Sequence, residues 1–233
     1  MPRRRPENGL DELVRAAAPI FSRRGFRRTQ MADVAREMGV SAGALYGYVE
    51  SKEALFAVTL ERAWRDDLPP PPTLPVPTPP RDKLVSLARE RLAPARSPTL
   101  SAALRQAAPE GGDVRAELSR LLLEIYRFLE ANRQSLALLE AAAKDRPELE
   151  AVYFGAGRSG LLERLDRYIR QRVAAGFLAA VPDSRIAARL LLETMAWFTR
   201  HRHGDVDDGV QDESIAEQTV VEMLTRTLLR SAS

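Results

Sequence analysis

Apolar residues along this chain recur at helical spacing, and no series of alternating apolar and polar residues suggests strands. One apolar stripe follows residues 10–21, a short second stripe follows 31–38, and further segments run to about Leu68. The pattern therefore predicts an all-α protein. Beyond residue 81 the expected helices are 82–93, 99–108, 113–131, 134–144, 148–175, 183–202 and 213–230.

A proline-rich segment interrupts the helical pattern. Residues 69–80 read PPPPTLPVPTPP, which cannot form a helix and favours polyproline II. A ligand for an SH3-type domain is one interpretation, and we favour the other, a semi-rigid connector. We therefore expect a helical domain over 1–68, a connector over 69–81 and a larger helical domain over 82–233.

The segment 30–49 carries the local signals of a helix-turn-helix. Gly39 stands where a left-handed glycine would end the preceding helix, and Ser41 can cap the next one. Val40 and Leu45 occupy the positions of a hydrophobic staple around that cap. Such a tight corner presents its second helix to the major groove of DNA.

The helix after Ser41 has two expected faces. Ala42, Leu45 and Val49 should pack inward, whereas Gly43, Ala44 and Gly47 point the other way. The glycines allow DNA to approach the backbone closely, or they are merely tolerated in a marginal helix. Tyr46 and Tyr48 flank the small residues, and their hydroxyls can donate to phosphate oxygens, with buried packing as the alternative.

Charge is concentrated at one end of the chain, although the net charge is only +3. The arginines of the first segment are Arg3, Arg4, Arg5, Arg15, Arg23, Arg24, Arg27 and Arg28. A basic stripe attracts polyanions, and an ordinary solvated face is the alternative. Thr29 is expected to cap the second helix and Ser51 the fourth. Lys52 then lies in a first turn, where its charge opposes the helix dipole and a phosphate could use both.

Several classes of protein are disfavoured. The chain has no cysteine, so disulfides and thiolate metal sites are absent. No apolar run is long enough for a membrane span, and no apolar stretch follows the basic residues at the start as in a secretory signal. We therefore expect a cytoplasmic protein without a membrane partner.

Two motifs suggest other functions. Gly155-Ala-Gly157-Arg-Ser-Gly160 matches the dinucleotide-binding fingerprint and follows a strand-like Val152-Tyr-Phe, but no second strand follows. We favour a helix start or a close helix crossing, with glycines that could border a pocket. His201 and His203 with nearby aspartates could suggest a metal site, but a charged helix end is favoured. We expect no cofactor, no metal and no catalytic residue.

At this point the chain resembles the TetR family of bacterial regulators. The matching residues are Phe21-x-x-x-Gly25-Phe26-x-x-Thr29, Val34-Ala35, Gly39-Val40-Ser41-x-Gly43-x-Leu45-Tyr46 and Lys52-Glu53-x-Leu55, within about residues 8–68. The resemblance implies a nine-helix homodimer with an N-terminal DNA-binding domain. It also implies a C-terminal domain that binds a small molecule and dimerises through its last two helices.

The resemblance carries over Thr29, Ser41, Gly43, Tyr46 and Lys52 as DNA-facing, with Gln30 and Tyr48 adjacent. Arg27, Arg28, Ala42 and Ala44 complete the expected contact set. Tyr48-Val49 and Gly47 depart from the family pattern, which usually has histidine and phenylalanine and often a large side chain. Direct base readout should therefore be sparse, with specificity resting on Gln30, Ser41, Tyr46 and DNA shape.

The expected function is a ligand-responsive repressor that releases its double-stranded DNA operator when it binds a small-molecule effector. A DNA-binding dimer without a ligand and an α-helical enzyme using Gly155–Gly160 are the alternatives. Candidate ligand-pocket residues are Glu124, Tyr126, Leu139, Tyr153, Phe154 and Trp197. Candidate dimerisation residues are Ile186, Leu190, Met195, Val220, Met223, Leu224 and Leu228.

Overall fold

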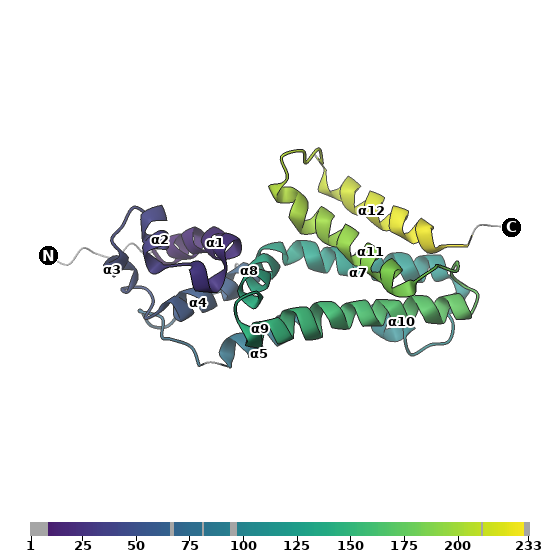
Figure 1. Cartoon of the computed structure of the whole chain (residues 1–233), viewed down its shortest axis with the longest axis horizontal. Helices are drawn as coiled ribbons and strands as arrows, with labels where there is room; N and C mark the ends of the chain where they lie inside the picture. Colours follow the sequence, from purple (N-terminus) through teal and green to yellow (C-terminus); the bar gives the residue numbers. More distant parts are fainter. Residues whose placement is uncertain (1–8, 66–67, 81, 94–96, 211, 231–233) are drawn as a thin grey trace. The chain divides into compact units, whose positions relative to one another are not determined.

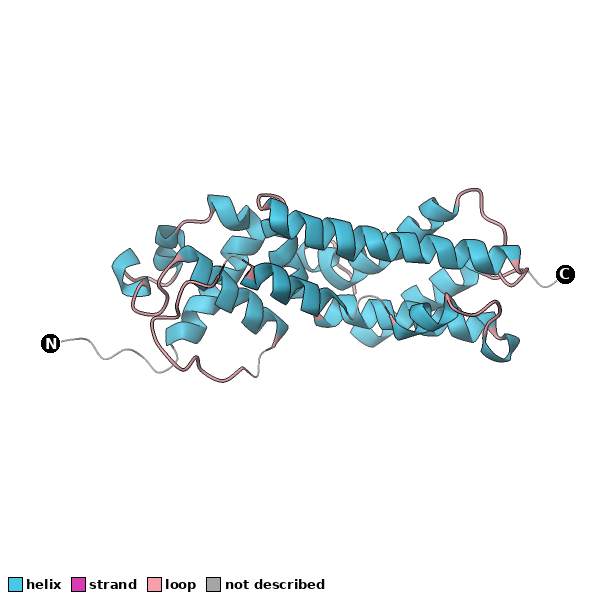
Figure 2. Cartoon of the chain, turned by 90° about the horizontal axis from the view of Figure 1, so that it is seen from below, coloured by secondary structure: helices cyan, strands magenta, loops and turns pink. Residues whose placement is uncertain are grey.

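The structure is a computed structural model that describes residues 9–65, 68–80, 82–93, 97–210 and 212–230. All regular elements in these ranges are helices, which confirms the predicted all-helical class (Figure 2). The α-helices are α1 (Gly9–Arg28), α2 (Met31–Glu37), α3 (Ala42–Leu45), α4 (Lys52–Trp64), α5 (Lys83–Leu92), α6 (Pro98–Ala103), α7 (Val114–Ala131), α8 (Arg133–Ala143), α9 (Pro147–Glu150), α10 (Gly160–Ala174), α11 (Ser184–Ala196) and α12 (Glu213–Leu228) (Figure 1). The helix expected over 99–108 is shorter than predicted and ends at Ala103.

The chain divides into two compact units. The first contains Met1–Arg91 together with Gln134–Phe154, and the second contains Leu92–Arg133 together with Gly155–Ser233. The first unit thus combines the predicted helix-turn-helix with α8 and α9, which come from far beyond the proline-rich segment. The domain limits placed around residues 69–81 stay a prediction, because compactness does not measure independent folding.

An aromatic cluster fixes α1 against α4 in the first unit. The Phe56 ring lies 5.1 Å from that of Phe21 and 5.4 Å from that of Phe26, edge to face in both pairs. Between the two α1 phenylalanines, Gly25 has a φ of +76° and interrupts the helical backbone. Glycine suits this left-handed conformation because it has no Cβ. The helical conformation therefore breaks at Gly25, within the bounds of α1.

The proline-rich segment is anchored to the first unit. Val76 and Val49 form an isolated parallel bridge, in which the Val76 N–H donates to the Tyr48 carbonyl oxygen at 2.7 Å. The Thr78 hydroxyl donates to Ser51 Oγ at 2.8 Å. The segment predicted as a connector is therefore hydrogen-bonded to the turn that joins α3 to α4.

The second unit is a helical bundle in which α7 packs against α11 and α12, and α10 packs against α11 (Figure 1). Its core contains Leu118, Leu121, Leu122 and Ile125 of α7, Leu165 and Ile169 of α10, Leu191 and Met195 of α11, and Val220 and Leu228 of α12. These apolar residues of α7 are therefore buried in the core of the second unit. No helix in the described part of the chain is long and apolar enough to cross a membrane.

A fully buried arginine ties α6, α7 and α10 together. Arg172 is 0% exposed, and its Nε donates to Glu117 Oε1 at 2.8 Å. Its Nη atoms donate to the carbonyl oxygens of Ala103 and Gln106 at 3.1 and 3.0 Å. Hydrogen bonding to Glu117 raises the pKa of Arg172, and burial raises the pKa of Tyr168, whose hydroxyl donates to the same carboxylate. The buried charge is thus fully partnered.

The glycine motif at Gly155–Gly160 belongs to a helix. A π-helical stretch, Ala151–Ser159, leads directly into α10. Val152–Phe154, although strand-like in sequence, are helical, in agreement with the helix expected over 148–175. Without that strand the segment lacks the βα turn on which dinucleotide binding depends.

Candidate nucleic-acid interface

The corner between α2 and α3 has the geometry that the sequence predicts. Gly39 has a φ of +67°, and its N–H donates to the Arg36 carbonyl oxygen at 3.2 Å. The Val40 N–H donates to the Ala35 carbonyl oxygen at 3.0 Å. These two hydrogen bonds form a Schellman motif, which ends α2 and turns the chain into Ser41. The helix-turn-helix is therefore built by backbone hydrogen bonds around a left-handed glycine.

Helix α2 is capped by a different residue from the one predicted. Gln30 is the N-cap, and Asp33 Oδ2 accepts its N–H at 3.1 Å, which lowers the pKa of Asp33. Thr29 is only 1% exposed, and its hydroxyl donates to the Gly25 carbonyl oxygen at 2.7 Å. The predicted cap at Thr29 is therefore wrong. Because its side chain is buried, Thr29 cannot contact DNA through that side chain. Thr29 is therefore removed from the expected set of DNA-contacting residues.

Helix α3 presents a small, nearly apolar face to solvent. Leu45 and Val49 are buried, whereas Ser41, Gly43 and Ala44 are exposed and Ala42 is half-buried. This burial agrees with the faces predicted from the sequence, except that Ala42 is only partly covered. The helix offers few polar groups to base edges.

The two tyrosines beside α3 have different surroundings. Tyr46 is 49% exposed and ends the helix as its C-cap residue. Tyr48 is half-buried, and its phenol ring and hydroxyl lie so close to Gly9 that a side chain there would collide with them. Tyr48 therefore packs against the start of α1, and Tyr46 is the tyrosine with the larger surface for a partner.

Lys52 joins the start of α4 to the end of α1. Its Nζ donates to the carbonyl oxygens of Thr29 at 3.0 Å and Arg27 at 3.3 Å, and lies 4.5 Å from the centre of the Phe26 ring. The charge that opposes the dipole of α4 is therefore stabilised by the carbonyl end of α1. Lys52 positions two helices, and its contact with DNA phosphate stays a prediction.

A joint that the sequence analysis missed connects α1 to the loop between α8 and α9. Asp145 Oδ2 accepts the Arg27 N–H at 2.7 Å, and a Cβ at Gly25 would lie 2.9 Å from that oxygen. The Arg146 guanidinium lies 4.7 Å from the centre of the Phe26 ring, so two cations contact this ring. An Asp-Arg-Pro sequence between helices is an ordinary loop signal, and nothing in it predicts this partner.

Exposed arginines gather toward the end of α1, and Arg15 is exposed further back on the same helix. Arg27 and Arg28 are exposed, and Arg28 Nε donates to the Arg24 carbonyl oxygen at 3.1 Å. Arg24 forms an ion pair with Asp33 at 3.0 Å. Arg3, Arg4 and Arg5 lie outside the described residues. The described part of the basic stripe is therefore centred on the joint between α1 and α2.

The predicted dimerisation residues fall into two groups. Ile186 and Leu190 of α11 are each 62% exposed, Met223 of α12 is exposed, and Leu224 is half-buried. Met195, Val220 and Leu228 pack inside the core of the second unit, so their assignment as surface contacts is wrong. The sequence shows a wide apolar stripe on these helices. It does not reveal which residues of the stripe pack inside the helical bundle of the second unit and which stay exposed. Exposed Ile215 belongs to the outer edge and was missed.

The predicted pocket residues have varied surroundings. Leu139, Tyr153 and Phe154 belong to the first unit, and Glu124, Tyr126 and Trp197 to the second. Glu124 accepts hydrogen bonds from Ser97 and Thr99, and Tyr153 donates to Glu140 at 3.0 Å. The buried Tyr126 hydroxyl has no hydrogen-bond partner in the described part of the chain, and burial raises its pKa to about 12. An unpartnered buried hydroxyl is the strongest support for a pocket role among these six.

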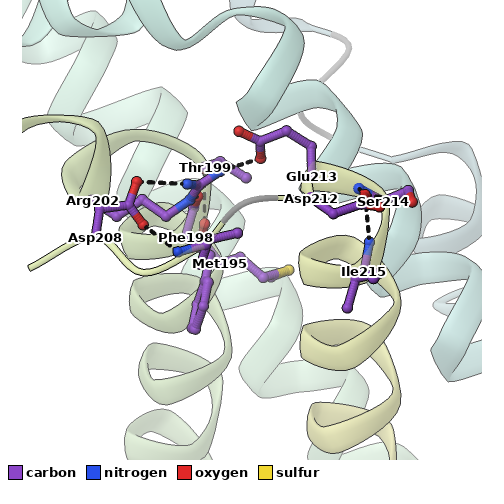
Figure 3. A network of polar contacts seen from close by, with 10 residues as sticks. Met195, Phe198, Thr199, Arg202, Asp208, Asp212, Glu213, Ser214 and Ile215 are labelled. Carbon is purple, nitrogen blue, oxygen red and sulfur yellow. Dashed lines mark hydrogen bonds and ion pairs between the residues drawn. The ribbon is translucent and has the colours of Figure 1, made fainter.

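A second buried arginine closes the turn between α11 and α12 (Figure 3). Arg202 is 1% exposed, pairs with Asp208 at 2.8 Å and with Glu213, and donates to the Phe198 carbonyl oxygen.

The residues around His201 and His203 form a charged helix end, in agreement with the favoured interpretation. In the described ranges no three potential ligands cluster as a metal site.

A helix-turn-helix with an exposed second helix, on an otherwise helical chain, defines a DNA-binding regulator. Residues 13–59 match the model for bacterial regulatory proteins of the tetR family, and residues 116–230 match that for the AefR-like transcriptional repressor C-terminal domain. Together these matches cover more than half of the sequence. The chain belongs to the TetR family of transcriptional regulators.

Sequence relatives match over a short part of the chain. The chain is 42% identical over 50 residues to YfiR of Bacillus subtilis, an uncharacterized HTH-type transcriptional regulator, which covers 22% of this chain and 24% of the relative. It is 40% identical over 57 residues to the repressor KstR2 of Rhodococcus jostii, covering 24% of this chain and 28% of that protein. The chain thus matches only about a quarter of the length of these relatives.

Solved structures match over nearly the whole chain. The ketosteroid transcriptional regulator KstR2 of Mycobacterium tuberculosis has a TM-score of 0.54, 17% identity and 97% coverage of both chains. The TetR family regulator PfmR of Thermus thermophilus has a TM-score of 0.51 and 22% identity, over 92% of this chain and 97% of that one. At such identities the likeness shows the fold alone.

Proposed function

We propose that this protein is a homodimeric repressor that binds an operator in double-stranded DNA and releases it when a small-molecule effector binds its C-terminal part. The observation that carries the proposal is the hydrogen bond from the Arg27 N–H to Asp145. Asp145 lies in the region matched by the C-terminal family model, whereas Arg27 lies in the last turn of α1, the helix before α2. A ligand-dependent movement of α8 and α9 would therefore reach the DNA-reading helices directly.

The proposed DNA contacts lie on α3 and at the joint before α2. They consist of the exposed Arg27, Arg28, Gln30, Ser41, Gly43, Ala44 and Tyr46 and the half-buried Ala42, Tyr48 and Lys52. Arginines beside a helix start supply phosphate affinity, and the few polar groups supply limited base readout. Specificity then depends on Gln30, Ser41, Tyr46 and the shape of the operator.

The proposed dimer interface is the outer edge of α11 and α12. Four large apolar side chains on these two helices support the proposal because they are exposed: Ile186, Leu190, Ile215 and Met223. Large apolar side chains left in water favour a second copy of the same surface. A dimer would place two recognition helices on half-sites about 34–36 Å apart.

Fluorescence anisotropy with DNA from upstream of the protein's own gene tests the proposal. We expect binding that is much tighter than to shuffled DNA and that weakens steeply with salt. Light scattering should give twice the chain mass. Equal affinity for both DNAs would overturn the DNA-binding part. A screen in which no metabolite lowers operator affinity would favour a DNA-binding dimer without a ligand.

A further inference from the structure

Two open cavities lie along α10 in the second unit, and they share three charged side chains. Each has a volume of about 670 Å³. Glu163, Arg164 and Arg167 line both cavities. Volumes of this size suit small organic ligands. The cavity that also contacts α6 is called the α10 groove here, and its main lining residues are Leu104, Arg105, Gly160, Leu161, Arg164 and Arg167.

The groove has an excess of positive charge. Arg105 and Arg167 are exposed, and no carboxylate in the described part of the chain forms an ion pair with either. Their neighbour Arg170, in contrast, pairs with Asp166 at 3.0 Å. Arg164 also lines the groove, and its Nη2 donates to the Ser101 hydroxyl at 2.6 Å. With Glu163 as the only acidic residue of the lining, three arginines leave a net positive charge.

Part of the lining of the groove is apolar. Leu92, Leu104 and Leu161 contribute side chains, and Gly157 and Gly160 contribute none. Beyond the four nearest residues of the helix, a Cβ at Gly160 would have one neighbour within 4 Å, the Gly155 carbonyl oxygen of the preceding π-helical stretch, at 3.9 Å. The space beside Gly160 therefore belongs to the groove. Two glycines of the motif, Gly157 and Gly160, line this cavity.

We propose that the α10 groove binds an amphiphile with an anionic head, a carboxylate or a phosphate, and that this ligand is the effector. The planar guanidinium groups of Arg105 and Arg167 match either head group with paired N–H donors. The apolar part of the ligand lies on the leucines beside the glycines. The effector role rests on the proposed function, whereas binding can be measured without DNA.

The groove is connected along the chain to the joint at α1. Gly157 belongs to the π-helical stretch Ala151–Ser159, which follows α9 without a break. Asp145 and Arg146 immediately precede α9 and contact the end of α1. A ligand that changes the winding of this stretch therefore changes the position of the residues that hold α1.

Titration calorimetry tests the proposal, with decyl phosphate and decanoate below their micelle concentrations and decanol below its solubility limit. We expect both anions to bind at least about tenfold more tightly than decanol, because charge-assisted hydrogen bonds add affinity. The double variant R105Q/R167Q should lose that difference. Gly160→Leu should abolish binding of all three by filling the groove. Arg120→Gln on α7 and Gly155→Leu are matched controls that line neither cavity and should bind as wild type.

The outcomes separate the groove from the proposed function. Equal binding of decanol and the anions, no binding, or unchanged binding by R105Q/R167Q would overturn the groove as an anion site. Binding of upstream DNA without ligand would then still support the DNA-binding role. Anion binding that leaves operator affinity unchanged in anisotropy would overturn the effector role. Anion binding that weakens operator affinity, and does so only in proteins with an intact groove, supports the proposal.

Discussion

Both compact units use a cation to hold the carbonyl end of a helix, but the two cations have different surroundings. In the second unit Arg172 bonds to the carbonyl oxygens at the end of α6 and to the buried carboxylate of Glu117. In the first unit Lys52 bonds to the carbonyl oxygens at the end of α1. No carboxylate in the described ranges pairs with Lys52, whose main other neighbour is the Phe26 ring.

This difference separates a rigid contact from one that can change. A buried, fully bonded arginine is costly to disturb, because any movement leaves a charge unpaired in the core. A half-buried lysine on an aromatic ring loses little when it moves, because water replaces the carbonyl oxygens. We infer that the second unit is held together firmly at α6, α7 and α10, and that the end of α1 is the adjustable part.

Removal of the rigid contact should have the largest effect. Arg172→Met leaves the buried Glu117 carboxylate without its cation and should lower the free energy of unfolding by about 3–5 kcal/mol. Urea unfolding followed by circular dichroism measures this loss. The double variant R172M/E117Q should recover part of it, because the uncompensated charge is gone. A loss below about 1 kcal/mol would contradict the rigid-contact interpretation.

Removal of the adjustable contact should affect DNA binding more than stability. Lys52→Met keeps the aliphatic stem but loses the hydrogen bonds to α1, so α2 is less well positioned. We expect operator affinity to fall about tenfold, which corresponds to about 1.4 kcal/mol. Lys83→Met is the matched control, since that ammonium pairs with Glu61 at 3.5 Å. Equal operator affinity of the two variants would contradict the role given to Lys52.

Loss of one phosphate contact should have a smaller and more specific effect. Arg28→Gln removes an exposed charge beside α2 and should reduce the slope of log affinity against log salt by about 1. Anisotropy at four salt concentrations measures the slope. Arg226→Gln on α12 should leave it unchanged. A slope identical in both variants and wild type would remove Arg28 from the contact set.

The smallest expected effect concerns Glu130 in the second unit. Burial raises the pKa of Glu130, and Glu213 and Glu217 raise it further, so its ionised form destabilises the folded state. Stability should therefore increase as pH falls through the folded-state pKa. Glu130→Gln removes the charge and should raise Tm at pH 7.5 by about 1–3 °C. The advantage should disappear below the unfolded-state pKa of about 4.3. A Tm of Glu130→Gln below that of wild type at pH 7.5 would contradict the claim that ionised Glu130 destabilises the folded state.

Much of the helix-turn-helix could be predicted because its determinants are local. Gly39 and Ser51 act on backbone groups within a few residues of themselves, so the sequence alone reveals them. The start of α2 was misassigned by one residue because Thr29 and Gln30 can both accept hydrogen bonds as caps. Thr29 does not cap α2, because its hydroxyl donates to the Gly25 carbonyl oxygen near the end of α1.

The remaining determinants are long-range and leave no local trace. Asp145 and Arg27 are 118 residues apart in the sequence, and an aspartate before Arg146-Pro147 is typical of any helix end. Similarly, Met195 and Leu190 belong to the same apolar stripe of α11. Only the packing of the bundle shows that Met195 is inside and Leu190 outside. The cavity along α10 depends on side chains from separate helices.

The affinity of Asp145→Ala for the operator tests the central claim most directly. This variant removes the carboxylate that accepts the Arg27 N–H and so loosens the end of α1. Asp113→Ala is the control, because it removes a similar carboxylate that accepts the Ala116 N–H at the start of α7. The account predicts operator affinity about tenfold weaker for Asp145→Ala, and unchanged for Asp113→Ala, at comparable Tm. Operator affinity equal to wild type in folded Asp145→Ala would contradict it.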